Sequence, residues 1–258
     1  VYFANLLSAI VFVFGLIYFC QKLPIPWLAL IISIPFLFLV VSMGYTRQSV
    51  AVGFLMWALV ELSRGSRLKY YALIFLGLLF HKTLVIMFLV GLFYNKKRGV
   101  LFYVLSSIII IQIVMFLESN YFSHMVYYYI TVQFHQSGGA LIRVIMSAFA
   151  GLVFFVYRKK FKKVYHDEDL WFLFSAASIM LLPMAFFYST LVDRVAIYFL
   201  PLQLVIFSRI PALITSTYYR SIFIISVVFM YITVMFVWLN FGTYSWLWMP
   251  YKNIMTGG

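Results

Sequence analysis

The sequence predicts an all-α integral membrane protein whose helices cross the bilayer several times. Hydrophobic residues occupy 66% of the 258 positions and charged residues only 10%, whereas soluble domains carry about 25% charged residues. Apolar runs of about 20 residues, the length that a transmembrane helix needs, recur along the chain. These runs are continuous and do not alternate with polar residues, so the pattern favours helices over a β-barrel.

We expect about eight transmembrane helices within a single integral-membrane domain that covers residues 1–258. The predicted spans are Val1–Cys20, Pro26–Tyr45, Thr46–Leu62, Gly99–Leu117, Ala140–Tyr157, Leu170–Thr190, Val195–Phe207 and Ser221–Asn240. The single cysteine, Cys20, lies in an apolar run, which excludes a disulfide framework and favours a packing role. The chain opens on Val1 without a basic region or a cleavage site, so its first segment is interpreted as a membrane helix.

One further apolar segment, Tyr70–Tyr94, is interrupted at its middle by His81, Lys82 and Thr83. Basic clusters flank it on both sides, and its 25 residues are too few to cross the bilayer twice. We therefore predict a re-entrant hairpin of two half-helices, each about 11 residues long and reaching roughly 16 Å, close to the bilayer midplane.

The hairpin places most of the positive charge on one side of the membrane. The net charge is +13, but the basic residues form short clusters between apolar runs, which is typical of cytoplasmic loops and argues against nucleic acid as a partner. The residues on this side are Lys22, Arg64, Arg67, Lys69, Lys96, Lys97, Arg98, Arg158, Lys159, Lys160, Lys162, Lys163, Arg209 and Arg220. The external side then holds Glu118–Gly139 and the tail from Phe241. A single crossing by Tyr70–Tyr94 would instead export the cluster Arg158–Lys163.

The basic residues that remain are Arg47, Lys82, Arg143, Arg194 and Lys252. Lys252 lies in the tail and can extend to the interface. The other four lie at or within membrane helices, where a charge costs several kcal/mol and usually marks a functional cavity. Arginine binds phosphate oxygens with two parallel hydrogen bonds, so we interpret the arginines as ligands of an anionic substrate. The alternatives are contact with lipid headgroups for Arg47 and Arg143, and for Arg194 an ion pair with its neighbour Asp193 or across helices.

Few residues are available for acid–base chemistry. The chain has six acidic residues, of which only Glu118 and Asp193 fall on the external side, so a paired-carboxylate glycosidase and a carboxylate-held metal are poorly supported. Nucleotide-binding and metal-ligand motifs are missing, and no cofactor is expected. His81 is either a proton carrier or a core histidine that fixes the hairpin turn. The aromatic stretch Tyr121–Tyr129 is either a surface helix or a platform for sugar rings.

Several short motifs resemble the EpsG family of polysaccharide polymerases. They are Gly44-Tyr45-Thr46-Arg47-Gln48, then Leu79-Phe80-His81-Lys82-Thr83, then Asp193-Arg194 with Tyr198, and finally Pro250-Tyr251. Their order and spacing cover nearly the whole chain. Members of this family usually carry a further N-terminal portion with an Asp-Tyr-x-x-Tyr-like segment, which has no counterpart here, so we expect the chain to lack its beginning.

The resemblance implies a bacterial inner-membrane enzyme, like the Wzy O-antigen polymerases, that joins undecaprenyl-pyrophosphate-linked oligosaccharide repeats at the periplasmic face. By motif, the candidate substrate-binding residues are Arg47, Gln48, Lys82, Arg194 and Tyr198, to which the charge pattern adds Arg143. His81 and Asp193 are the candidate catalytic residues. The expected partners are the lipid-linked oligosaccharide, membrane lipids and a chain-length regulator protein.

Three other functions remain open at this point. A flippase or transporter for a lipid-linked saccharide usually shows an internal repeat and paired broken helices, whereas this sequence shows one broken segment. A membrane acyltransferase would use His81 but normally needs an acidic neighbour. A non-catalytic partner of a chain-length regulator is the third alternative.

Overall fold

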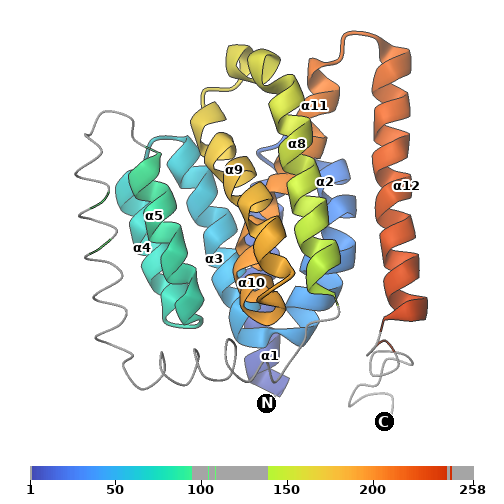
Figure 1. The fold of residues 1–258 in the computed structure, drawn as a ribbon. Coiled ribbons are helices and arrows are strands. Elements are labelled where there is room, and N and C mark those ends of the chain that lie inside the picture. The colour runs from blue at the N-terminus through green and yellow to red at the C-terminus, as the bar shows by residue number, and fades with distance from the viewer. Residues whose placement is uncertain (1, 95–103, 105–107, 109–138, 243–244, 246–258) are drawn as a thin grey trace.

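The described part of the chain folds into a bundle of long helices that run roughly parallel to one axis (Figure 1). The structure is a computed structural model and describes residues 2–94, 104, 108, 139–242 and 245. In chain order the helices are α1 (Tyr2–Cys20), α2 (Pro26–Ser33), the π-helix η1 (Ile34–Ser42), α3 (Thr46–Ser63), α4 (Arg67–Leu78), the 3₁₀ helix η2 (Lys82–Val85), α5 (Ile86–Phe93), α8 (Ala140–Val164), α9 (Glu168–Ala185), α10 (Ser189–Ala196), the 3₁₀ helix η4 (Ile197–Phe199), α11 (Pro201–Leu213) and α12 (Thr217–Phe241).

Every element in this list is a helix, which confirms the predicted all-α class. Four helices, α1, α8, α9 and α12, are long and apolar enough to cross a membrane. The segments Ser189–Phe199 and Pro201–Leu213 meet at an angle of 43° and give a fifth crossing if they form one span. The protein is therefore a multi-pass membrane protein with four to five candidate spans among its described residues. The span predicted at Gly99–Leu117 lies outside those residues.

Most predicted spans correspond to helices of the structure, with differences at their ends. The span predicted at Pro26–Tyr45 is a short α-helix that continues as the π-helix η1. The span predicted at Thr46–Leu62 is α3, which is not among the helices that are long and apolar enough to cross a membrane, because both of its ends are polar.

The first helix packs against α3 at a glycine contact. A Cβ atom on Gly15 would lie only 2.2 Å from the carbonyl oxygen of Gly53, so only glycine permits this close approach.

The predicted break at His81 is present, and the segment around it is a helical hairpin. The helices α4 and α5 lie side by side and antiparallel (Figure 1), and the Tyr70 hydroxyl near the start of α4 donates to the carbonyl of Met87 in α5. A Cβ atom on Gly77 or Gly91 would clash with the opposite arm of the hairpin. The hairpin therefore returns the chain to the end from which α4 started, as the sequence predicted.

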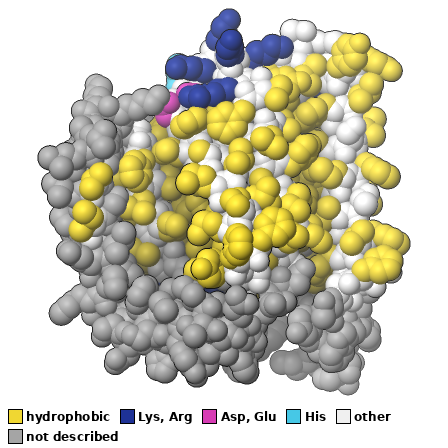
Figure 2. Space-filling model, viewed as in Figure 1, with side chains coloured by type: hydrophobic (Ala, Val, Ile, Leu, Met, Phe, Trp, Pro, Cys, Tyr) yellow, Lys and Arg dark blue, Asp and Glu magenta, His cyan; other side chains and the backbone are white. Residues whose placement is uncertain are grey.

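Basic side chains gather at that end of the bundle, which we call the basic end and define by Lys22, Arg64, Arg158 and Arg209. Figure 2 shows lysine and arginine side chains grouped at this end above a largely hydrophobic flank. Because α1, α3, α8 and α11 all finish there, the prediction that the basic clusters share one side holds for the described residues. Lys96–Arg98, Glu118–Gly139 and the tail beyond Ser245 lie outside them.

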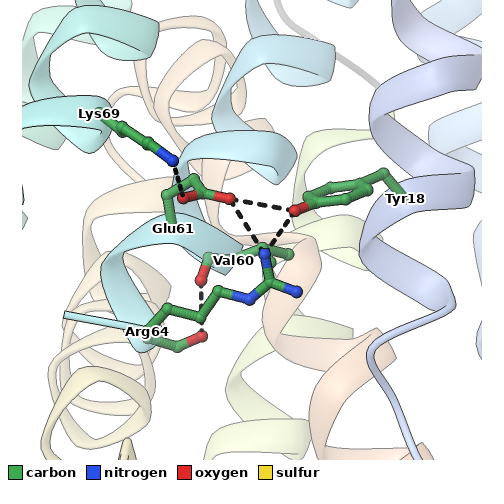
Figure 3. A network of polar contacts seen from close by, with 6 residues as sticks. Tyr18, Val60, Glu61, Arg64 and Lys69 are labelled. Carbon is green, nitrogen blue, oxygen red and sulfur yellow. Dashed lines mark hydrogen bonds and ion pairs between the residues drawn. The ribbon is translucent and has the colours of Figure 1, made fainter. Parts of the chain in front are cut away.

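Ion pairs connect the helices at the basic end. Glu61 accepts a hydrogen bond from the Tyr18 hydroxyl at 3.0 Å and forms ion pairs with Arg64 at 3.3 Å and Lys69 at 3.7 Å (Figure 3). Arg64 also donates to the Tyr18 hydroxyl at 2.7 Å. Since these side chains come from α1, α3 and α4, the network links the hairpin to the rest of the bundle. Between α3 and α4 the chain turns at Gly65, whose φ of +85° suits glycine.

Candidate functional site

The candidate site lies at the end of the bundle opposite the basic end and is centred on His81. This residue follows the end of α4, has an extended backbone (φ −146°, ψ +111°) and precedes the 3₁₀ helix η2. Its ring atom Nδ1 lies 2.7 Å from the Tyr198 hydroxyl and 2.8 Å from the Thr83 hydroxyl. The two hydroxyl oxygens are 3.0 Å apart. The broken segment is therefore joined to η4, more than 100 residues later in the chain.

Gln48 connects a third part of the chain to this cluster. It lies in the first turn of α3 and is 3% exposed. Its side-chain nitrogen donates to the backbone carbonyl of Arg194 at 2.8 Å. The same side chain lies within hydrogen-bonding reach of the Tyr198 hydroxyl. We call Gln48, His81, Thr83, Arg194 and Tyr198 the histidine cluster.

Arg143 and Asp193 form a buried ion pair next to the histidine cluster. Arg143 Nε donates to Asp193 Oδ1 at 2.7 Å, and Arg143 Nη2 donates to Oδ2 at 2.5 Å. Each residue is only 4% exposed, and the guanidinium group also lies 5.9 Å from the ring centre of Phe36 in η1. The sequence left open an ion pair at Asp193-Arg194 between neighbours or across helices, and the structure places the carboxylate of Asp193 on Arg143 of another helix. The pair joins α8 to α10.

The other cations differ from Arg143 in their exposure. Arg47, in the first turn of α3, is exposed and forms no ion pair with a described residue, and Lys82 is exposed at the tip of the hairpin. Arg194 is half-buried and lies within electrostatic reach of both His81 and Tyr198. All of these cations lie at the end of the bundle opposite the basic end, as predicted for the arginines. Their roles in substrate binding stay predictions.

Two residues that sequence reasoning did not select also lie at this site. Thr83 contacts both members of the His81–Tyr198 pair, and its only sequence signal was its place in the polar interruption of an apolar segment. Tyr45 lies within electrostatic reach of Asp193, Arg143 and Arg194. Its sequence signal was its position beside Arg47 in the first motif. The predicted aromatic stretch Tyr121–Tyr129 and the motif Pro250-Tyr251 lie outside the described residues.

The arrangement suits the binding of an anion beside a hydrogen-bonded histidine. It offers fixed N–H and O–H donors, arginine and lysine cations, and few carboxylates. Within residues 2–94 and 139–242, no three His, Cys, Asp or Glu side chains lie together in a way that could hold a metal ion.

Comparison with known proteins identifies the family. No curated protein and no solved structure matches the chain significantly. The model of the EpsG family matches residues 1–253, which is nearly the whole chain. The resemblance that the motifs indicated is thereby confirmed, and it associates the chain with exopolysaccharide polymerases. This multi-pass helical membrane protein belongs to the EpsG family.

Proposed function

We propose that the protein is a membrane glycosyltransferase that polymerises lipid-linked oligosaccharide repeats at the histidine cluster. The observation that carries the proposal is the meeting of three segments that resemble family motifs. Gln48, His81 and Tyr198 come from α3, the hairpin tip and η4. His81 and Tyr198 are hydrogen-bonded to each other, and Gln48 donates to the backbone carbonyl of Arg194, four residues before Tyr198. A packing role alone would not require a histidine, a glutamine and cations to gather at one end of an apolar bundle.

The proposed substrate is an oligosaccharide linked to undecaprenyl pyrophosphate. In the reaction, a hydroxyl oxygen of the incoming repeat forms a bond to the anomeric carbon of the growing glycan. The bond from that carbon to the pyrophosphate oxygen breaks, and its electron pair leaves with the lipid pyrophosphate. The proton of the attacking hydroxyl passes to a base. Such a reaction depends on positioning and on stabilising the negative charge of the leaving group.

The cations of the site match the second of these needs. Arg47 and Lys82 are exposed and Arg194 is half-buried, and we propose these side chains as the ligands of the pyrophosphate. Arg143 and Asp193 bind one another in a buried pair. They would reach a substrate only after that pair had opened. We therefore assign them first to holding α10, which carries Arg194 and leads to Tyr198.

We infer the orientation in the membrane from the distribution of charge. Lysine- and arginine-rich ends of helical membrane proteins face the cytoplasm. The basic end would then be cytoplasmic and the histidine cluster would face the periplasm across the bacterial inner membrane. Lipid-linked repeats, membrane lipids and a chain-length regulator would be its partners there.

A transporter for lipid-linked saccharides is the second candidate. The sequence showed one broken segment, but the structure has a second bend of 43° between Ser189–Phe199 and Pro201–Leu213. Paired broken helices are common at the binding sites of transporters, so this observation favours the alternative. The enzyme remains the better-supported proposal because of the family match and the hydrogen-bonded histidine.

Reconstitution separates the two functions. The purified protein would be placed in vesicles that contain lipid-linked repeats extracted from the source cells, and the products would be separated by length. A polymerase lengthens the glycan and releases one undecaprenyl pyrophosphate for each repeat that it adds. Movement of the lipid-linked saccharide across the vesicle membrane without any lengthening would overturn the enzyme proposal and support the transporter.

A further inference from the structure

We propose that His81 acts as a fixed hydrogen-bond donor, through a proton on Nε2, to a phosphate-type anion. Tyr198 and Thr83 would set this state by occupying Nδ1. The identity of the anion as the lipid pyrophosphate rests on the proposed function, while the state of the ring does not. The inference departs from the role in which His81 accepts the proton of the attacking hydroxyl.

The contacts of the ring are all on one side. Both hydroxyl groups approach Nδ1, at 2.7 Å and 2.8 Å, and lie 3.0 Å from one another. Nε2 forms no hydrogen bond with a residue in the described ranges 2–94 and 139–242. At neutral pH a histidine ring is mainly uncharged and carries one proton.

Counting the protons favours one of the two ring nitrogens as the carrier of that proton. If Nδ1 accepts, the Tyr198 hydroxyl donates to it, and the Thr83 proton is directed between Nδ1 and the Tyr198 oxygen. Every proton then has an acceptor. If Nδ1 carries a proton, three protons converge on two hydroxyl oxygens, and one of them must turn to the Gln48 side chain, which lies within reach of the Tyr198 hydroxyl and already donates to the carbonyl of Arg194. The first arrangement also joins the more acidic hydroxyl, a phenol, to the stronger acceptor, an imidazole nitrogen.

When Nδ1 accepts the hydrogen bond from Tyr198, the ring proton resides on Nε2, and Nε2 can donate a hydrogen bond to a ligand. A neutral donor placed among cations suits an anion. Lys82 is the next residue in the chain, and Gln48 binds the backbone of Arg194. Donors fixed before the reaction stabilise negative charge that develops on a leaving oxygen. The ring therefore contributes to catalysis through a hydrogen bond, and the proton of the acceptor hydroxyl goes to a group other than His81.

Nitrogen NMR tests the state of the ring without any need for polymerase activity. The full-length protein, labelled with ¹⁵N-histidine, would be measured in lipid nanodiscs near pH 8. The chain has four histidines, and the signals that disappear in His81→Asn belong to His81. We expect Nε2 to carry the proton. Tyr198→Phe and Thr83→Val should shift the Nδ1 signal, whereas Tyr188→Phe and Thr233→Val, at exposed positions outside the cluster, should not.

A titration with inorganic pyrophosphate tests the ligand. It should shift the Nε2–H signal of wild-type His81. Chain extension provides a separate test, because the side-chain amide of His81→Gln can replace the Nε2–H donor but cannot act as a base. We expect His81→Asn to extend glycans about 10²-fold more slowly than the wild type, the usual effect of removing such a donor. The His81→Gln variant should extend them only about tenfold more slowly than the wild type.

Three results would overturn the inference. They are a proton on Nδ1 in the wild type, an Nε2–H signal that saturating pyrophosphate leaves unchanged, and equal losses in the Asn and Gln variants. If wild-type protein bound pyrophosphate at an Nε2–H donor but never lengthened a glycan, the proposed function would fail and this inference would stand. If the wild-type protein extended glycans normally while the His81 proton lay on Nδ1, the proposed function would stand and this inference would fail.

Discussion

Arg143 and Asp193, which are 50 residues apart in the chain, share two hydrogen bonds in a buried ion pair that ties α8 to α10. The pair is close to the histidine cluster, since Arg194 follows Asp193 directly and Tyr198 is one helical turn further along. Removing one member of a buried ion pair leaves an uncompensated charge and typically costs 3–5 kcal/mol. The pair therefore fixes α10, which carries Arg194, against α8.

We predict that Arg143→Ala and Asp193→Asn both destabilise the protein, by roughly 3–5 kcal/mol. Arg143→Lys should destabilise less, because it keeps the charge and loses only the two-pronged geometry. Thermal unfolding of the purified variants measures this. If both variants unfolded like the wild type and lost only activity, Arg143 would be a substrate ligand instead of an anchor for α10.

A substitution at Arg47 should lower activity without lowering stability. Because it is exposed and has no ion pair with a described residue, Arg47→Lys should leave the unfolding temperature unchanged while lowering the rate of chain extension, since lysine cannot make the two parallel bonds to phosphate. Arg67→Lys, an exposed arginine of α4 near the basic end, is the matched control and should extend normally. Full activity of Arg47→Lys would show that Arg47 contacts lipid headgroups or solvent instead.

The orientation can be tested with single cysteines in a Cys20→Ser background. Lys163→Cys lies at the basic end and Tyr188→Cys at the opposite end, and both native residues are exposed. A membrane-impermeant thiol reagent added to intact cells should label position 188 and spare position 163. Labelling of position 163 alone would reverse the proposed orientation and would place the histidine cluster in the cytoplasm.

Arg209 and Asp167 provide a test of stability at the basic end. Asp167 accepts two hydrogen bonds from Arg209, at 2.6 Å and 3.0 Å, and one from Trp171 at 2.8 Å. Asp167→Asn removes the charge that compensates a largely buried arginine and should destabilise by about 3–5 kcal/mol. His166→Gln changes the exposed neighbour and should have little effect. Equal unfolding temperatures for the two variants would show that water compensates the arginine.

Much of the fold could be predicted from the sequence because the signals are local. Apolar runs gave the helices, and α1 begins and ends within one residue of its predicted span. The polar interruption at His81 predicted the hairpin, because a segment of 25 residues between two basic clusters on one side of the membrane is too short to cross the bilayer twice. The π-helix at Ile34–Ser42 could not be predicted, because its residues are as apolar as those of an ordinary membrane helix.

The site was predictable as a set of residues but not as a set of contacts. Unusual charges in an apolar chain drew attention to Arg47, Arg143 and Arg194, and motif order added Gln48 and Tyr198. Sequence alone could not show that Arg143 binds Asp193, because that pairing depends on how α8 packs against α10. The role of Thr83 was hidden for the same reason, since its second contact lies 115 residues away.

The most direct test of the central claim compares substrate binding with chain extension in purified His81→Asn protein. A polymerase centred on the histidine cluster predicts that this variant folds, still binds the lipid-linked repeat, and extends the bound repeat about 10²-fold more slowly, because a donor to the leaving group has been lost. Extension at the wild-type rate would contradict the account. It would leave His81 as a residue that fixes the turn of the hairpin.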